Sequence, residues 1–80
     1  METDYLRAIL SPIIKFPEDL KIERIQDEQG ILLNVEVRRE DMGLVIGKGG
    51  EIAITIRRLL RQYGFLNQKR ISMKVIEPEG

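Results

Sequence analysis

Six residues, Val45-Ile46-Gly47-Lys48-Gly49-Gly50, lie between a short apolar segment and a long amphipathic one, and they decide how the chain folds. Glycine adopts positive φ readily and has no Cβ, so this turn allows another backbone to come close. The helix that begins after Gly50 starts with N–H groups that have no partner inside the helix, and Lys48 adds a positive charge. The six residues therefore predict an anion site, and we expect the anion to be a nucleic-acid phosphate.

Two other phosphate motifs do not fit this stretch. A P-loop requires Gly-x-x-x-x-Gly-Lys-Ser/Thr, whereas Gly43 and Gly47 are one residue too close and Gly49 replaces the hydroxyl residue. A dinucleotide-binding turn requires a further glycine and a preceding strand, and neither is predicted here. A Gly-x-x-Gly loop between two helices is instead typical of KH domains, which clamp about four nucleotides of a single strand. The alternative is an ordinary corner between two helices, in which a glycine ends the first one.

The composition excludes several kinds of function. The chain has 80 residues, which is enough for one small domain with a modest core. It has no cysteine and no histidine, so it lacks the residues of thiolate metal sites and the commonest general base. We therefore expect no enzyme activity, no metal and no cofactor. The start Met-Glu-Thr-Asp is acidic and no apolar run is long enough to span a membrane, so we expect a cytoplasmic protein.

The charges are unevenly distributed, although they cancel over the whole chain. Residues 1–37 carry four basic and eight acidic side chains, whereas residues 38–70 carry eight basic and three acidic ones. This asymmetry suggests one basic face on a neutral protein. An ordinary solvated helix surface explains the pattern equally well at this magnitude.

The first half of the chain predicts a helix and then a hairpin. Residues 2–15 show helical apolar spacing at Leu6, Ile9, Leu10 and Ile13, and Pro12 predicts a break near Ser11 because proline removes a backbone donor. Residues 20–38 follow as two strands around a turn that ends in a glycine.

The phase of apolar residues differs between the two strands of this hairpin. Ile25 is out of phase with Leu20 and Ile22, which predicts a bulge or an early end of the first strand. The second strand alternates cleanly, with Ile31, Leu33, Val35 and Val37 facing one way. Leu32 interrupts its polar face, so we consider it a candidate contact for a ligand or partner.

The second half predicts a helix–loop–helix unit over residues 41–63 and a last strand over 70–77. Asp41 is the expected cap of the short first helix, and Gly64 is the expected end of the second. On that second helix an apolar stripe, which includes Leu59, faces the core, while Arg57, Arg58, Arg61 and Ile54 lie off it. Residues 77–80 are expected to form a tail.

The predicted order is α-β-β-α-α-β, which indicates an α+β domain in two layers. The first two strands form an antiparallel hairpin. The third strand returns after two helices, so it must run parallel to one of them. We therefore expect a three-stranded mixed sheet that three helices cover on one face.

The central stretch resembles the KH signature of small stand-alone bacterial RNA-binding proteins. The resemblance extends from Val45 through Ala53 to Ile56-Arg57, and it includes Asp41-Met42-Gly43 and the N-terminal helix with an internal proline. It covers nearly the whole chain, so the chain is identified as a single KH domain of the prokaryotic (type II) fold over residues 1–80.

The resemblance implies a groove that holds single-stranded RNA, or in some cases single-stranded DNA. One wall is the helix–loop–helix unit and the other is a strand of the sheet. It also implies post-transcriptional regulation, and pairing either with a second copy or with a larger KH-containing RNA-binding protein. The residues it places at the RNA are Gly43, Val45, Ile46, Gly47, Lys48, Gly49, Gly50 and Arg57.

Two departures from the family pattern favour an alternative. Gly49 stands where a basic or polar residue is common, and Ile54 stands where a basic residue is common, so the electrostatic attraction for RNA is weaker. Ile54 is for this reason a candidate partner contact. The alternative is a KH-shaped interaction or dimerisation module in which RNA binding is secondary. An enzyme is the least favoured of the three hypotheses because the chain offers no obvious catalytic pair.

Overall fold

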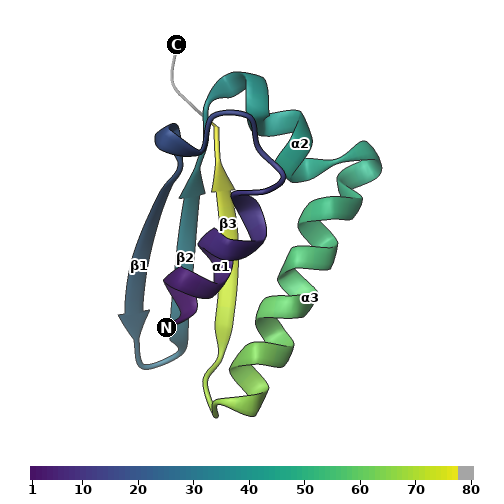
Figure 1. Cartoon of the computed structure of the whole chain (residues 1–80). Coiled ribbons are helices and arrows are strands. Elements are labelled where there is room, and N and C mark those ends of the chain that lie inside the picture. The colour runs from purple at the N-terminus through teal and green to yellow at the C-terminus, as the bar shows by residue number, and fades with distance from the viewer. Residues whose placement is uncertain (78–80) are drawn as a thin grey trace.

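The computed structural model describes residues 1–77 as two layers, a sheet and a set of helices (Figure 1). The predicted element order α-β-β-α-α-β and the α+β class are confirmed. Residues 78–80 of the expected tail lie outside the described residues. The elements are α1 (Glu2–Leu10), β1 (Lys21–Asp27), β2 (Gly30–Glu36), α2 (Met42–Ile46), α3 (Glu51–Leu66) and β3 (Ile71–Ile76), with 3₁₀ turns at Pro17–Asp19, Arg39–Asp41 and Lys48–Gly50.

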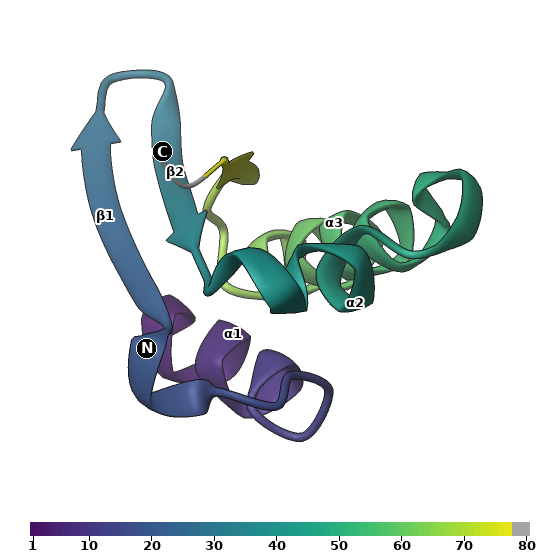
Figure 2. The same ribbon diagram turned by 90° about the horizontal axis from the view of Figure 1, so that it is seen from above.

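The sheet has the strand order β1-β2-β3, so β1 and β3 form its two edges. β1 pairs antiparallel with β2 from Lys21 opposite Glu36 to Asp27 opposite Gly30, and β3 runs parallel to β2 as predicted. Figure 2 shows the helices together on one face of this sheet. The expected bulge at Ile25 is wrong, because the register is continuous and Ile25 simply pairs with Leu32 on the outer face.

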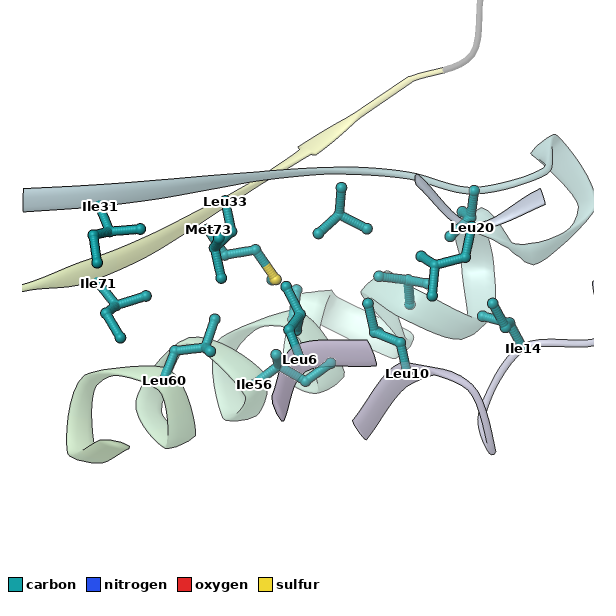
Figure 3. Close-up of a cluster of buried hydrophobic side chains, with 14 residues drawn as sticks. Leu6, Leu10, Ile14, Leu20, Ile31, Leu33, Ile56, Leu60, Ile71 and Met73 are labelled. Carbon is teal, nitrogen blue, oxygen red and sulfur yellow. The ribbon is translucent and has the colours of Figure 1, made fainter. Parts of the chain in front are cut away.

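The core lies between the inner face of the sheet and the helices (Figure 3). Leu33 and Val35 from β2 and Leu6 and Leu10 from α1 have no exposed surface. Full burial of a leucine or valine stabilises a fold by about 1.5–3 kcal/mol, so this contact fixes how α1 lies on the sheet.

Two positions of the predicted apolar faces differ in the structure. Ile14, rather than Ile13, enters the core, because α1 ends at Leu10 and the following turns change the helical spacing. The break expected from Pro12 is therefore confirmed. Leu59 is 41% exposed although it belongs to the apolar stripe of α3.

Gly64 does not end α3, which continues to Leu66. A glycine is needed at this position for a different reason, because a Cβ there would clash with the carbonyl oxygen of Lys69 and press on Ile71. The N–H of Lys69 donates to the carbonyl of Gly64 at 2.7 Å, so the chain reverses tightly against the helix and enters β3. α3, at sixteen residues, is the longest helix, and within residues 1–77 no helix is long and apolar enough to cross a membrane.

A buried carboxylate connects the loop after α1 with the start of α2. Asp41 is 0% exposed and accepts hydrogen bonds from the N–H groups of Lys15 at 3.1 Å and Phe16 at 2.8 Å. Its side chain makes no capping bond to α2, so the expected capping role is wrong. Charged acceptors bond more strongly than neutral ones, which suits a group that must fix a loop.

A second buried carboxylate fixes the start of the chain. Glu2 is 1% exposed and accepts a hydrogen bond from the guanidinium of Arg24, while the Lys69 ammonium lies 3.6 Å away. Burial raises the pKa of Glu2, but the hydrogen bonds and the two positive charges outweigh it and leave the pKa below 4.5. The carboxylate therefore stays charged at neutral pH and joins α1 to β1 and to the turn before β3.

We expect Asp41→Ala to lower the free energy of unfolding by about 2–4 kcal/mol. The substitution leaves two partly buried N–H groups without an acceptor, and a hydrogen bond to a charged group contributes about 1.5–3 kcal/mol. Urea denaturation of the purified variant measures the change. The neighbouring Glu40→Ala, at an exposed position, is the control and should stay within about 0.5 kcal/mol of wild type. Equal stability of the two variants would contradict the role assigned to Asp41.

Candidate nucleic-acid interface

The loop between α2 and α3 has the left-handed backbone that its glycines predict. Gly47 has φ 77° and ψ 172°, and Gly49 and Gly50 have φ 67° and 76° with ψ 16° and 11°. A residue with a Cβ rarely adopts these angles. The loop therefore makes a compact reversal that only a glycine-rich sequence forms without strain.

Two of these glycines leave open space, whereas the third does not. A Cβ on Gly47 would lie 2.6 Å from the side chain of Ile52, so this glycine is needed for packing inside the loop. A Cβ on Gly49 or Gly50 would meet nothing within 4 Å. The surface over Gly49 and Gly50 is therefore bare backbone that a ligand can approach.

Two backbone donors of the loop itself are free, whereas those of Gly50 and Glu51 are not. The N–H of Gly50 donates to the carbonyl of Gly47 at 3.1 Å, and the N–H of Glu51 donates to that of Lys48. Within residues 1–77, the N–H groups of Lys48 and Gly49 donate to no protein acceptor. Lys48 is exposed, and no carboxylate among these residues pairs with it. Two amides and one ammonium therefore remain for an anion.

The surface of α2 next to the loop combines an exposed glycine with a partly exposed isoleucine. Gly43 is exposed and a Cβ there would meet nothing, and Ile46 is 36% exposed. Val45 does not share this surface. It is 0% exposed and packs in the core, so the expectation that its side chain lines the groove is wrong, and it holds α2 in place from behind.

The edge strand β3 lies beside α3. Arg57, on α3, extends to this strand, and its Nε donates to the carbonyl oxygen of Met73 at 3.4 Å. This carbonyl is a backbone acceptor on the open edge, the kind of group that can hydrogen-bond a base. Sequence reasoning missed it, because a backbone carbonyl has no residue-type signature.

Ile54 lies on the exposed face of α3, as its helical phase predicted, with 45% of its surface exposed. Gly43, Ile46 and Lys48 are exposed at or next to the loop, whereas Arg57 lies two turns into α3 at the edge of β3, and Ile54 precedes it by one turn on the same side of the helix. Leu32 faces outward from the middle strand of the sheet, on the face opposite the helices. It is remote from the loop, so it takes no part in this site.

Known proteins of similar sequence have been found across nearly the whole chain. The family model described as the KhpA/KhpB KH domain matches residues 3–75. A protein of Listeria monocytogenes named RNA-binding protein KhpA is 36% identical over 74 residues, which is 92% of this chain and 97% of the relative. Proteins of the same name from Clostridium acetobutylicum and Bacillus subtilis are 34% and 30% identical, over 89% and 92% of this chain and 95% and 91% of their own lengths.

The glycines of the helix–loop–helix unit should respond differently to alanine. Gly43→Ala should raise the free energy of unfolding by about 0.5–1 kcal/mol, because alanine favours helix and the site has room. Gly47→Ala should lower it by at least about 1–2 kcal/mol, since a positive φ and a clash with Ile52 combine.

Urea denaturation of both variants measures these changes. Gly50→Ala is the matched control for the positive φ alone, because its Cβ would meet nothing, and its stability should fall between the other two. A destabilised Gly43→Ala would contradict the open space described beside α2.

Proposed function

The chain belongs to the KhpA/KhpB KH-domain family, and from this we propose that it binds single-stranded RNA and acts in post-transcriptional regulation. The family is one of binding proteins rather than enzymes, so the enzyme hypothesis is dropped. The relatives carry RNA binding in their names, and the observation in this chain that supports it is the loop of residues 47–50. We also propose that it acts in the cytoplasm.

The loop supplies donors for one phosphate group without a large positive field. The N–H groups of Lys48 and Gly49 have no acceptor within residues 1–77, Lys48 is exposed, and a Cβ on Gly49 or Gly50 would meet no neighbouring atom. An RNA strand can therefore bring its phosphates to within hydrogen-bond distance. Arg57 and the edge of β3 receive the bases on the other side, and Ile46 supplies apolar contact between them.

This arrangement favours single strands over duplexes. An A-form duplex keeps its base edges inside its grooves. It is also too wide to follow the path that a single strand would take along α3 and the edge of β3. Few phosphates are neutralised, so the affinity should decrease only slightly with salt, by a slope of about −0.7 per contact. Single-stranded DNA shares the phosphate and the base edges and is the expected weaker ligand.

We expect the double substitution Lys48→Asp and Gly49→Asp to weaken RNA binding at least about tenfold, which corresponds to about 1.4 kcal/mol. One positive charge becomes two negative ones beside the expected phosphate, and two side chains cover bare backbone. Fluorescence anisotropy with a labelled pyrimidine-rich oligonucleotide measures the affinity, and circular dichroism checks that the helices remain.

A matched control places the same charge change elsewhere. Lys21→Asp with Gln29→Asp alters two exposed residues of the hairpin, away from the loop. This control should bind RNA within about threefold of wild type if local charge matters more than net charge. Wild-type affinity in the loop variant, or equal binding of duplex and single strand by the native protein, would refute the groove.

We also propose that the chain pairs with a second copy or with a larger KH-containing protein. Two exposed apolar areas of α3 support this proposal. One is Ile54, and the other is a mostly apolar groove between α1 and α3, to which Leu59, Ile9, Ile13 and Ile52 contribute and which Lys48 and Glu51 also line. Because four apolar side chains share the groove, it offers more contiguous apolar surface than Ile54 alone. Leu59, 41% exposed, is the most exposed of the four.

Separate lysine substitutions distinguish these two areas. Leu59→Lys should shift the protein toward monomer in sedimentation velocity, because burying an unpaired ammonium in an apolar interface is costly. Ile54→Lys should do so only if Ile54 belongs to the same contact. Both positions are exposed, so both variants should fold. A native protein that sediments as a monomer at every concentration would contradict self-pairing and leave the larger partner.

A further inference from the structure

The exposed side of α3 carries an unusual ladder of side chains. Arg57, Arg61 and Phe65 are each four residues apart, so they lie on one side of the helix, and Arg58 lies next to them. All four are exposed, and Phe65 is 76% exposed. The ladder begins at the candidate groove, because Arg57 contacts the edge of β3. It ends at the far end of α3, near the turn into β3 (Figure 1).

No acidic side chain among residues 1–77 forms an ion pair with the three arginines of α3. Within residues 1–77 the ion pairs involve Arg24, Arg38, Lys69 and the N-terminal amine, and no pair includes an arginine of α3. The acidic residue of α3 is Glu51, which lies at the opposite end of the helix from Phe65. A chain with no net charge thus has a local line of three cations. Such a line is complementary to a polyanion.

Phe65 differs from the other aromatic residues of the chain. Tyr5 and Tyr63 stack on one another with their ring centroids 4.4 Å apart, and the Phe16 ring lies 4.1 Å from the Arg38 guanidinium. Phe65 is the remaining aromatic residue, and its ring is open to solvent. An exposed aromatic ring is a stacking platform for a nucleic-acid base of any type.

The neighbouring Leu66 helps to choose between RNA and protein as the occupant. Leu66 is as exposed as Phe65, at 78%, but it projects about 100° further around the helix. A purely apolar partner would have reason to cover both residues. The arginines lie on the side of Phe65, so charge complementarity favours a strand that offers phosphates and bases in alternation.

We infer that Arg61 and Phe65 form an additional nucleotide subsite, in which Arg61 binds a phosphate and Phe65 stacks a base of the same RNA strand. The inference rests on the proposed RNA binding and extends its footprint. From Gly50 to Phe65 the helix rises about 22 Å, and a stacked strand advances about 3.4 Å per nucleotide. A strand that starts at the loop therefore needs about six or seven nucleotides to reach Phe65, more than the four that the loop clamps.

The test compares oligouridines of four and twelve nucleotides on the full chain. Phe65→Ala should bind the twelve-nucleotide RNA at least about fivefold more weakly than wild type, and the four-nucleotide RNA equally well. Arg61→Gln should weaken the longer RNA and reduce its salt slope by about 0.7. Leu66→Ala is the matched control, equally exposed and one position along, and it should change neither affinity.

Phe65→Trp gives an independent readout, because the chain has no other tryptophan. Its fluorescence should be quenched by the twelve-nucleotide RNA and unchanged by the four-nucleotide RNA. The inference is overturned if Phe65→Ala binds the longer RNA like wild type, if Leu66→Ala loses as much affinity, or if Phe65→Ala changes only the sedimentation of the protein. Failure of the native chain to bind either RNA would instead refute the proposed function.

Discussion

The position of the loop depends on one buried carboxylate. Asp41 lies just before α2 and accepts hydrogen bonds from two consecutive backbone amides of the loop after α1, at Lys15 and Phe16. α2 has five residues, too few to be stable alone. Burial of Val45 and the bonds to Asp41 supply what the short helix lacks. The loop of residues 47–50 is therefore held by contacts with a segment about 25 residues earlier in the chain.

Periodicity predicted most of the fold, and the exceptions have local causes. The apolar spacing of the helices and strands predicted the element order and the mixed sheet, and the glycines after Ile46 predicted the positive φ angles. Gly64 was misinterpreted as a helix end, because a sequence does not distinguish a glycine that ends a helix from one that admits another backbone. Asp41 was misinterpreted as a cap for a similar reason: the amides that it binds come from a distant segment.

The candidate site was predictable only where side-chain identity carries the information. Lys48, Gly49 and Arg57 could be named from the motif and the resemblance, and all three are exposed in the structure. The carbonyl of Met73 and the free amides of Lys48 and Gly49 could not, since any residue type can supply them. Val45 was misplaced because an apolar pair beside a loop does not reveal which member faces inward. The backbone groups of this site, and which of its side chains are buried, are thus known from the structure and not from the sequence.

The first strand of the sheet has a consequence for behaviour at high concentration. β1 is an edge strand of seven residues, and its unpaired backbone groups could add a strand from a neighbouring molecule. Its sequence places charges at Lys21, Glu23, Arg24 and Asp27, so a like strand would have to desolvate several of them to pair. The charged edge of β1 therefore disfavours strand-to-strand pairing between molecules in a concentrated solution.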